Sequence, residues 1–107
     1  MELRKRTVKN YISPTNRDCF HGWIRGIGNQ KARQAFRIRL NRVMQGNFGD
    51  CKPVGEGVYE LRFDLGPGYR IYFGEDGDDV ILLGGGDKST QDRDIKTAQE
   101  RWRDYNA

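Results

Sequence analysis

The chain has 107 residues, 36% of them hydrophobic, which suits a single domain with one modest core. No apolar run approaches the roughly 20 residues that a membrane-spanning helix needs, and the charged start of the chain lacks the apolar stretch of a signal peptide. We therefore expect one cytoplasmic domain over residues 1–107, without a membrane partner.

Metal and disulfide chemistry are disfavoured by the few residues that could support them. Cys19 and Cys51 are the only cysteines and His21 is the only histidine, so a zinc site would lack ligands. A disulfide is not expected in a reducing compartment. We therefore interpret the cysteines as ordinary thiols, assign His21 no role, and expect no metal and no small-molecule cofactor.

The net charge of +4 is unevenly distributed. Residues 1–46 hold eleven basic and two acidic side chains, a net charge of +9, whereas the other 61 residues hold eight basic and thirteen acidic ones, a net charge of −5. Such a basic half fits a polyanion or an acidic protein partner. The alternative is a basic helix face that water simply solvates.

A short strand over residues 3–12 and two helices are predicted in this basic half. Thr15 is the expected N-cap of the first helix, which ends at Gly28. Its buried face consists of Phe20, Trp23, Ile24 and Ile27. The second helix runs from about Gln30 to Gln45, with a buried stripe made of Ala32, Phe36, Leu40 and Val43. Arg39 lies within that stripe, so its guanidinium must either extend to the surface or find a partner, whereas Ile38 lies outside the stripe and could contact another chain.

Three strands and a final helix are predicted in the second half. Apolar and charged residues alternate strictly from Tyr59 to Leu65, a turn follows at Gly66–Gly68, and a strand covers residues 69–73. The all-apolar residues 80–83 predict a more deeply buried third strand. A glycine loop at residues 84–86 then leads to a helix whose capping box begins at Ser89. Its buried positions are Ile95, Ala98, Trp102 and Tyr105.

The order β, α, α, β, β, β, α predicts an α+β fold. We expect a small antiparallel β-sheet in the form of a meander, with the two N-terminal helices packed on one face and a C-terminal helix that also packs on apolar side chains. Helices on one face of an antiparallel sheet are the expected architecture.

Strict alternation divides the side chains of the hairpin between two faces. The core face receives Leu61, Phe63, Leu65, Ile71 and Phe73, and the opposite face receives Glu60, Arg62, Asp64, Arg70 and Tyr72. With a three-residue turn at Gly66–Gly68, Arg62 would lie opposite Tyr72 and Asp64 opposite Arg70. A rigid patch with two arginines and a tyrosine is therefore predicted on the exposed face.

This patch suits a phosphodiester, because arginine binds phosphate oxygens bidentately and tyrosine can stack on a base or exchange a proton. Lys52 and Lys88 flank the sheet in loops that could bring an ammonium group to its rim. The alternative is simple cross-strand salt bridging, worth about 0.2–1 kcal/mol a pair. The glycine run at residues 84–86 lacks the spacing of a phosphate-binding loop, which disfavours nucleotide binding.

Two segments of the chain resemble a known family. The string GNFGDCKPVGEGVYELRFDLGPGYRIYF, followed by LLGGGDKSTQDRDIKTA, is similar to the addiction-module killer proteins (HigB/RelE-like) within the RelE/ParE toxin superfamily of type II toxin–antitoxin systems. An F-x-x-W feature at Phe20 to Trp23 and an R-L-x-R feature at Arg39 to Arg42 extend the resemblance to about residues 15–100.

The resemblance implies a RelE-like fold and a cognate antitoxin, usually a helix-turn-helix protein. RelE-like members cleave mRNA on the ribosome, and ParE-like members inhibit DNA gyrase. The basic and aromatic residues favour the nuclease, so mRNA and the ribosome are the expected partners and inhibition of translation is the expected outcome.

The expected reaction is a metal-independent transesterification in which the RNA 2′-hydroxyl attacks the neighbouring phosphate. Arg62 and Arg70 would stabilise charge on the phosphoryl oxygens. The candidates for proton transfer are Lys52, Lys88, Tyr72 and Glu60. Three further residues would bind RNA, namely Arg33, Arg37 and Arg42.

Two alternatives remain open. A ParE-like, non-catalytic protein could inhibit gyrase, or bind another protein target, through the same basic surface. An antitoxin or DNA-binding domain is the weaker alternative, because no helix-turn-helix pair stands out among the basic helices.

Overall fold

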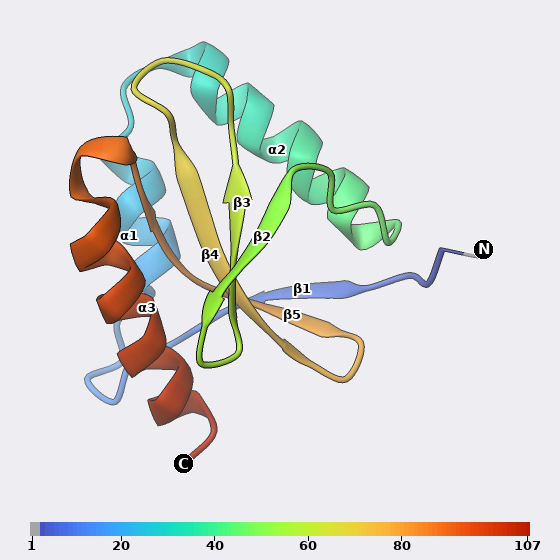
Figure 1. Cartoon of the computed structure of the whole chain (residues 1–107), viewed down its shortest axis with the longest axis vertical. Helices are drawn as coiled ribbons and strands as arrows, with labels where there is room; N and C mark the ends of the chain where they lie inside the picture. Colours follow the sequence, from blue (N-terminus) through green and yellow to red (C-terminus); the bar gives the residue numbers. More distant parts are fainter. Residues whose placement is uncertain (1–2) are drawn as a thin grey trace.

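The computed structural model describes residues 3–107 as an α+β fold, with helices on both faces of a five-stranded sheet (Figure 1). The strand order is β1 (Thr7–Asn10), β5 (Asp79–Gly86), β4 (Arg70–Asp76), β3 (Val58–Arg62) and β2 (Cys51–Gly55). β1 runs parallel to β5, and all other neighbours are antiparallel. The sheet is therefore mixed. The antiparallel meander predicted for the strands of the second half is confirmed in β3, β4 and β5, whereas the predicted all-antiparallel sheet is wrong at β1, because chain order does not say where the first strand joins. No helix in residues 3–107 is long and apolar enough to cross a membrane.

Two helices, α1 (Cys19–Arg25) and α2 (Gln30–Met44), pack on one face of the sheet. Asp18 caps α1 by accepting a hydrogen bond from the backbone N–H of His21. The predicted Thr15 cap is wrong, because Thr15 belongs to the preceding turn, and the helix ends at Gly26, before the predicted stop. The buried stripe predicted for α2 is confirmed.

An edge strand was missing from the predicted order. β2 (Cys51–Gly55) pairs antiparallel with β3 (Val58–Arg62), which in turn pairs with β4 (Arg70–Asp76). Pro53 interrupts any alternating pattern in β2, and proline is tolerated in a sheet mainly on an edge strand. The hydrophobic pattern of residues 51–55 therefore did not predict this strand, which forms because β3 pairs with it.

The β3–β4 hairpin has a longer turn than predicted. The backbone N–H of Phe63 donates to the carbonyl oxygen of Tyr69 at 3.0 Å, which leaves five turn residues instead of three. Arg62 therefore pairs with Arg70, and the predicted pairing of Arg62 with Tyr72 is wrong by two positions. Because a shift by two preserves the faces, the common face predicted for Arg62 and Arg70 is confirmed.

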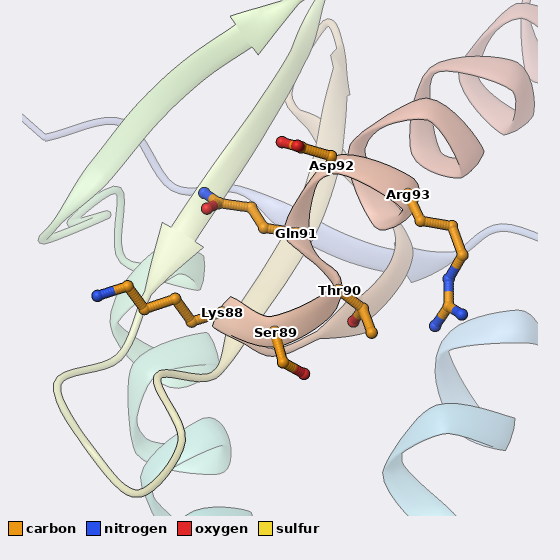
Figure 2. A pocket seen from close by; sticks show the side chains of 6 residues that line it. All are labelled: Lys88, Ser89, Thr90, Gln91, Asp92 and Arg93. Carbon is orange, nitrogen blue, oxygen red and sulfur yellow. The ribbon is translucent and has the colours of Figure 1, made fainter.

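The C-terminal helix, α3 (Gln91–Tyr105), follows a 3-10 turn at Lys88–Thr90 (Figure 2) and lies on the opposite face from α1 and α2. It packs on a second core cluster formed by Tyr11, Val58, Tyr72, Ile81, Leu83 and Ala98. The two N-terminal helices share one face as predicted, but the expectation that all helices lie on one face is wrong for α3. The all-apolar centre of β5 was the sequence signal, because such strands are buried on both faces.

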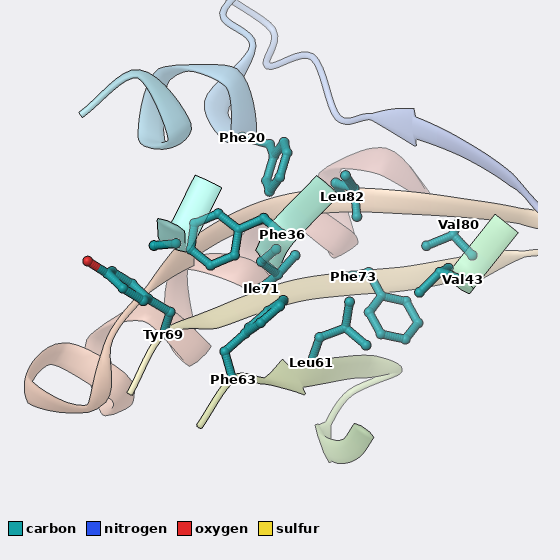
Figure 3. Packing of buried hydrophobic residues seen from close by; sticks show 11 residues of the cluster. Phe20, Phe36, Val43, Leu61, Phe63, Tyr69, Ile71, Phe73, Val80 and Leu82 are labelled. Carbon is teal, nitrogen blue, oxygen red and sulfur yellow. The ribbon is translucent and has the colours of Figure 1, made fainter. Parts of the chain in front are cut away.

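Aromatic rings dominate the core between the sheet and α1–α2 (Figure 3). The ring of Phe36 lies 4.9 Å from that of Phe63 and 5.3 Å from those of Trp23 and Tyr69, measured between centroids. These contacts connect both N-terminal helices to Phe63, directly after β3, and to Tyr69, directly before β4. The two ends of the β3–β4 turn therefore pack on the core.

The glycine run belongs to β5 and is not the predicted loop. A Cβ atom on Gly85 would lie 2.4 Å from the ring of Trp23 in α1, and one on Gly86 would lie 1.9 Å from an oxygen of Asp94 in α3. The glycines thus let a helix approach the strand closely on each face. Their role is in packing.

Candidate functional site

A cleft of about 350 Å³ opens where the β3–β4 turn meets the 3-10 turn. Its lining residues are Asp50, Arg62, Phe63, Asp64, Gly68, Arg70 and Lys88. The backbone N–H of Lys88 donates to the carbonyl oxygen of Pro67 at 3.4 Å, which joins the two turns. Figure 2 shows the side chains of Lys88 and Gln91 extended to the same side of the turn, and Arg93 on the other.

Arg70 is a buried cation at the base of this cleft. Only 6% of the residue is exposed, and Nη1 donates to the carbonyl oxygen of Gly68 at 3.0 Å. Its Nε lies 3.6 Å from Oε1 of Glu60 and has no hydrogen-bond partner among residues 3–107. The prediction of an exposed arginine is wrong, because α3 covers this face of the sheet.

Glu60 is the centre of a buried polar network beneath the cleft. Its Oε2 accepts hydrogen bonds from the hydroxyl of Tyr72 at 3.0 Å and from Nε2 of Gln91 at 2.9 Å. Its Oε1 faces Arg70 and lies 3.9 Å from Nε of Arg62. A carboxylate that is 1% exposed is tolerable only with such hydrogen bonds and opposite charges around it.

Tyr72 lies within this network and is 1% exposed. Burial, together with the charge of Glu60 and the hydrogen bond to it, raises the pKa of Tyr72 well above its ordinary value. The phenol therefore keeps its proton even at alkaline pH, and its buried ring offers no open surface on which a base could stack. Its geometry suits holding Glu60 in place.

The other predicted site residues lie elsewhere. Lys52 is exposed on β2, opposite Glu60 in the strand register, and does not line the cleft. Arg33, Arg37 and Arg42 are exposed on α2, on the other side of the sheet. The structure thus brings Arg62, Arg70 and Lys88 together in the cleft, places Glu60 and Tyr72 below it, and separates the remaining four.

Two residues of the site had not been predicted. Asp50 lines the cleft and Gln91 orients Glu60. Asp64, which was predicted on the same face as Arg62 and Arg70, lines the cleft with them and is its second carboxylate. Gln91 is the first residue of α3, shortly after the glycine run. No pattern in the sequence indicates that it bonds to Glu60. Within residues 3–107, no group of three His, Cys, Asp or Glu side chains is placed to hold a metal ion.

Residues 28–103 match the family model described as "Phage derived protein Gp49-like (DUF891)". The chain belongs to the Gp49-like family. It is also 49% identical over 81 residues to an uncharacterized protein of Haemophilus influenzae, an alignment that covers 75% of this chain and 82% of that protein. The Gp49-like region runs from α2 into α3 and contains every residue of the cleft, whereas β1 and α1 precede it.

Proposed function

We propose that this Gp49-like protein is the toxin of a type II toxin–antitoxin pair and that it cleaves mRNA on the ribosome at the Arg62–Arg70–Lys88 cleft. The observation that carries the proposal is that three basic side chains from β3, β4 and the turn before α3 converge on one cleft. The resemblance to RelE-like toxins supports the same function.

The charges and hydrogen bonds of the cleft suit a transition state with negative charge on phosphoryl oxygens. Arg70 is held by Gly68 and Glu60 before any ligand arrives, so little reorganisation is needed when charge develops. Arg62 is more exposed, with 39% of its side chain accessible, and can follow the substrate. The phosphoryl oxygens of a phosphodiester could accept hydrogen bonds from the basic side chains that line the cleft.

The proposed reaction is attack of the RNA 2′-hydroxyl on the adjacent phosphorus, with departure of the 5′-oxygen. The products are a 2′,3′-cyclic phosphate and a 5′-hydroxyl. Lys88 can protonate the leaving oxygen, and Asp50 or Asp64 can accept the proton of the 2′-hydroxyl, because all three line the cleft. The ribosome would orient the 2′-hydroxyl for in-line attack.

The decisive experiment induces the gene in a bacterial host and maps the new mRNA ends. We expect breaks within translated frames, 5′-hydroxyl ends, and arrest of protein synthesis. Arg62→Ala should abolish most of this cleavage. Arg93→Ala is the matched control, because Arg93 is an exposed arginine of the same region that lies outside the cleft.

A gyrase inhibitor would replace the nuclease if two results were obtained together. The mRNA would stay intact during growth arrest, and the purified protein would inhibit the supercoiling activity of purified gyrase. Harmless expression of the protein alone would remove the toxin proposal itself.

A further inference from the structure

The face of the molecule away from the cleft carries an apolar groove of about 380 Å³. Phe20, Phe36 and Leu82 form its floor and lie close together in Figure 3, and each is at most 6% exposed. Its apolar walls come from β1, α1 and α2, namely Val8, Ile24, Leu40 and Met44. Met44 remains 37% exposed, so the groove is open to a partner.

Positive charge without acidic partners lies along the α2 side of this groove. Arg33 and Arg37 line it from α2, a helix that holds five basic residues and no acidic one. Within residues 3–107, none of the basic residues of α2 has a carboxylate within salt-bridge distance. Asp18 is the acidic group bonded to the lining, through Asn10, and it is already used as the cap of α1.

We propose that this groove binds an amphipathic helix of a partner protein, whose apolar side chains enter the groove and whose acidic side chains pair with Arg33 and Arg37. An apolar floor with a charged rim is the pattern of helix-in-groove recognition, and complementary charge sets orientation and association rate. RNA is the less suitable occupant, because a charged phosphate backbone gains no favourable contact from an apolar floor of phenylalanine side chains.

This inference deepens the proposed function, since a toxin needs a silencing partner, but it does not depend on RNA cleavage. The probe is a synthetic 15-residue helical peptide with leucine at the i, i+3, i+4 and i+7 spacing and glutamate on the opposite face. Binding is followed by fluorescence anisotropy and by amide chemical shifts of the toxin. A peptide with lysine in place of each glutamate is the charge control.

We expect the acidic peptide to bind at least about tenfold more tightly than its lysine counterpart, and to shift the amides of Arg37, Leu40 and Met44 but not those of Gly68 or Lys88. The double variant Arg33→Glu/Arg37→Glu should lose about tenfold in affinity. Lys31→Glu/Arg42→Glu makes the same change of charge outside the groove and should bind nearly as the parent does.

A second pair of variants tests the apolar contact. Met44→Glu should weaken binding, whereas Ile38→Glu should not, because Ile38 is a similarly exposed residue of the same helix that does not line the groove. Equal binding of the acidic and lysine peptides, no binding up to about 1 mM, or amide shifts confined to the cleft would overturn the proposal. Shifts in the groove with single-stranded RNA but not with the acidic peptide would assign it to RNA instead. A bound peptide on a protein that leaves mRNA intact would uphold the groove and refute the nuclease.

Discussion

Removing either member of the Glu60–Arg70 pair should expose how strongly the network beneath the cleft depends on it. The loss of one partner from a buried ion pair costs about 3–5 kcal/mol, because the other charge is left uncompensated. In Arg70→Met, Glu60 keeps its hydrogen bonds from Tyr72 and Gln91, so we expect the lower limit, about 3 kcal/mol. The midpoint of thermal unfolding should fall by about 12–24 °C.

The double variant separates the pair from its surroundings. Glu60→Gln leaves Arg70 as the unpaired charge, whereas Glu60→Gln/Arg70→Met leaves none. The double variant should therefore lose less free energy of unfolding than the sum of the two single losses, by about 1–3 kcal/mol. Urea unfolding measures the four proteins, with an unchanged dependence on denaturant as the check that the unfolded states are comparable. Additive effects within about 0.5 kcal/mol would refute the pair.

Three further predictions test the cleft, the glycines and the buried Tyr11. Arg62→Ala should lower RNA cleavage by roughly 10²–10³ while the free energy of unfolding changes by about 0–1 kcal/mol, and a parallel loss of stability in thermal unfolding would instead make Arg62 structural. Gly85→Ala should destabilise the fold by about 1–3 kcal/mol through overpacking, whereas Gly22→Ala, which meets nothing within 4 Å, should be neutral or stabilising in the same urea titration; similar costs at both positions would contradict the packing role. Burial, and the hydrogen bond that its hydroxyl donates to Asp104, raise the pKa of Tyr11 to about 12, so the stability this adds is complete below pH 10 and is lost as the pH rises toward 12. The free energy of unfolding of Tyr11→Phe should consequently fall less in that window than that of the parent, and equal slopes would count against it.

Local periodicity was enough to predict the parts of the fold that depend on one segment. The buried stripe of α2 and the common face of Arg62 and Arg70 follow from the repeats of a helix and a strand, whatever lies next to them. The length of the β3–β4 turn does not follow in this way, because Tyr69 pairs with Phe63 through the backbone and packs on Phe36 from another element.

The burial of the predicted site residues was not predicted from the sequence, and it too results from tertiary packing. The alternation placed Glu60, Arg70 and Tyr72 on a polar face, and a polar face normally meets water. In this protein α3 covers it, so the polar side chains must satisfy one another. The continuous apolar run of β5 already indicated that both faces are covered, but it did not say which helix covers which residue.

Arg39 connects the groove side of the molecule to the cleft side. From the buried stripe of α2, its guanidinium donates to the carbonyl oxygens of Phe48, Asp50 and Arg62 at 2.9, 2.8 and 3.0 Å. Two of these acceptors belong to residues that line the cleft. Lysine could not reproduce these contacts, because its donors all lie on one nitrogen, whereas Arg39 uses the separate Nε and Nη2 of its planar guanidinium. Its place in the stripe predicted that the guanidinium would either reach the surface or find a partner, and backbone carbonyl groups are the partner. These hydrogen bonds connect the basic helix α2 to the end of the strand that carries Arg62.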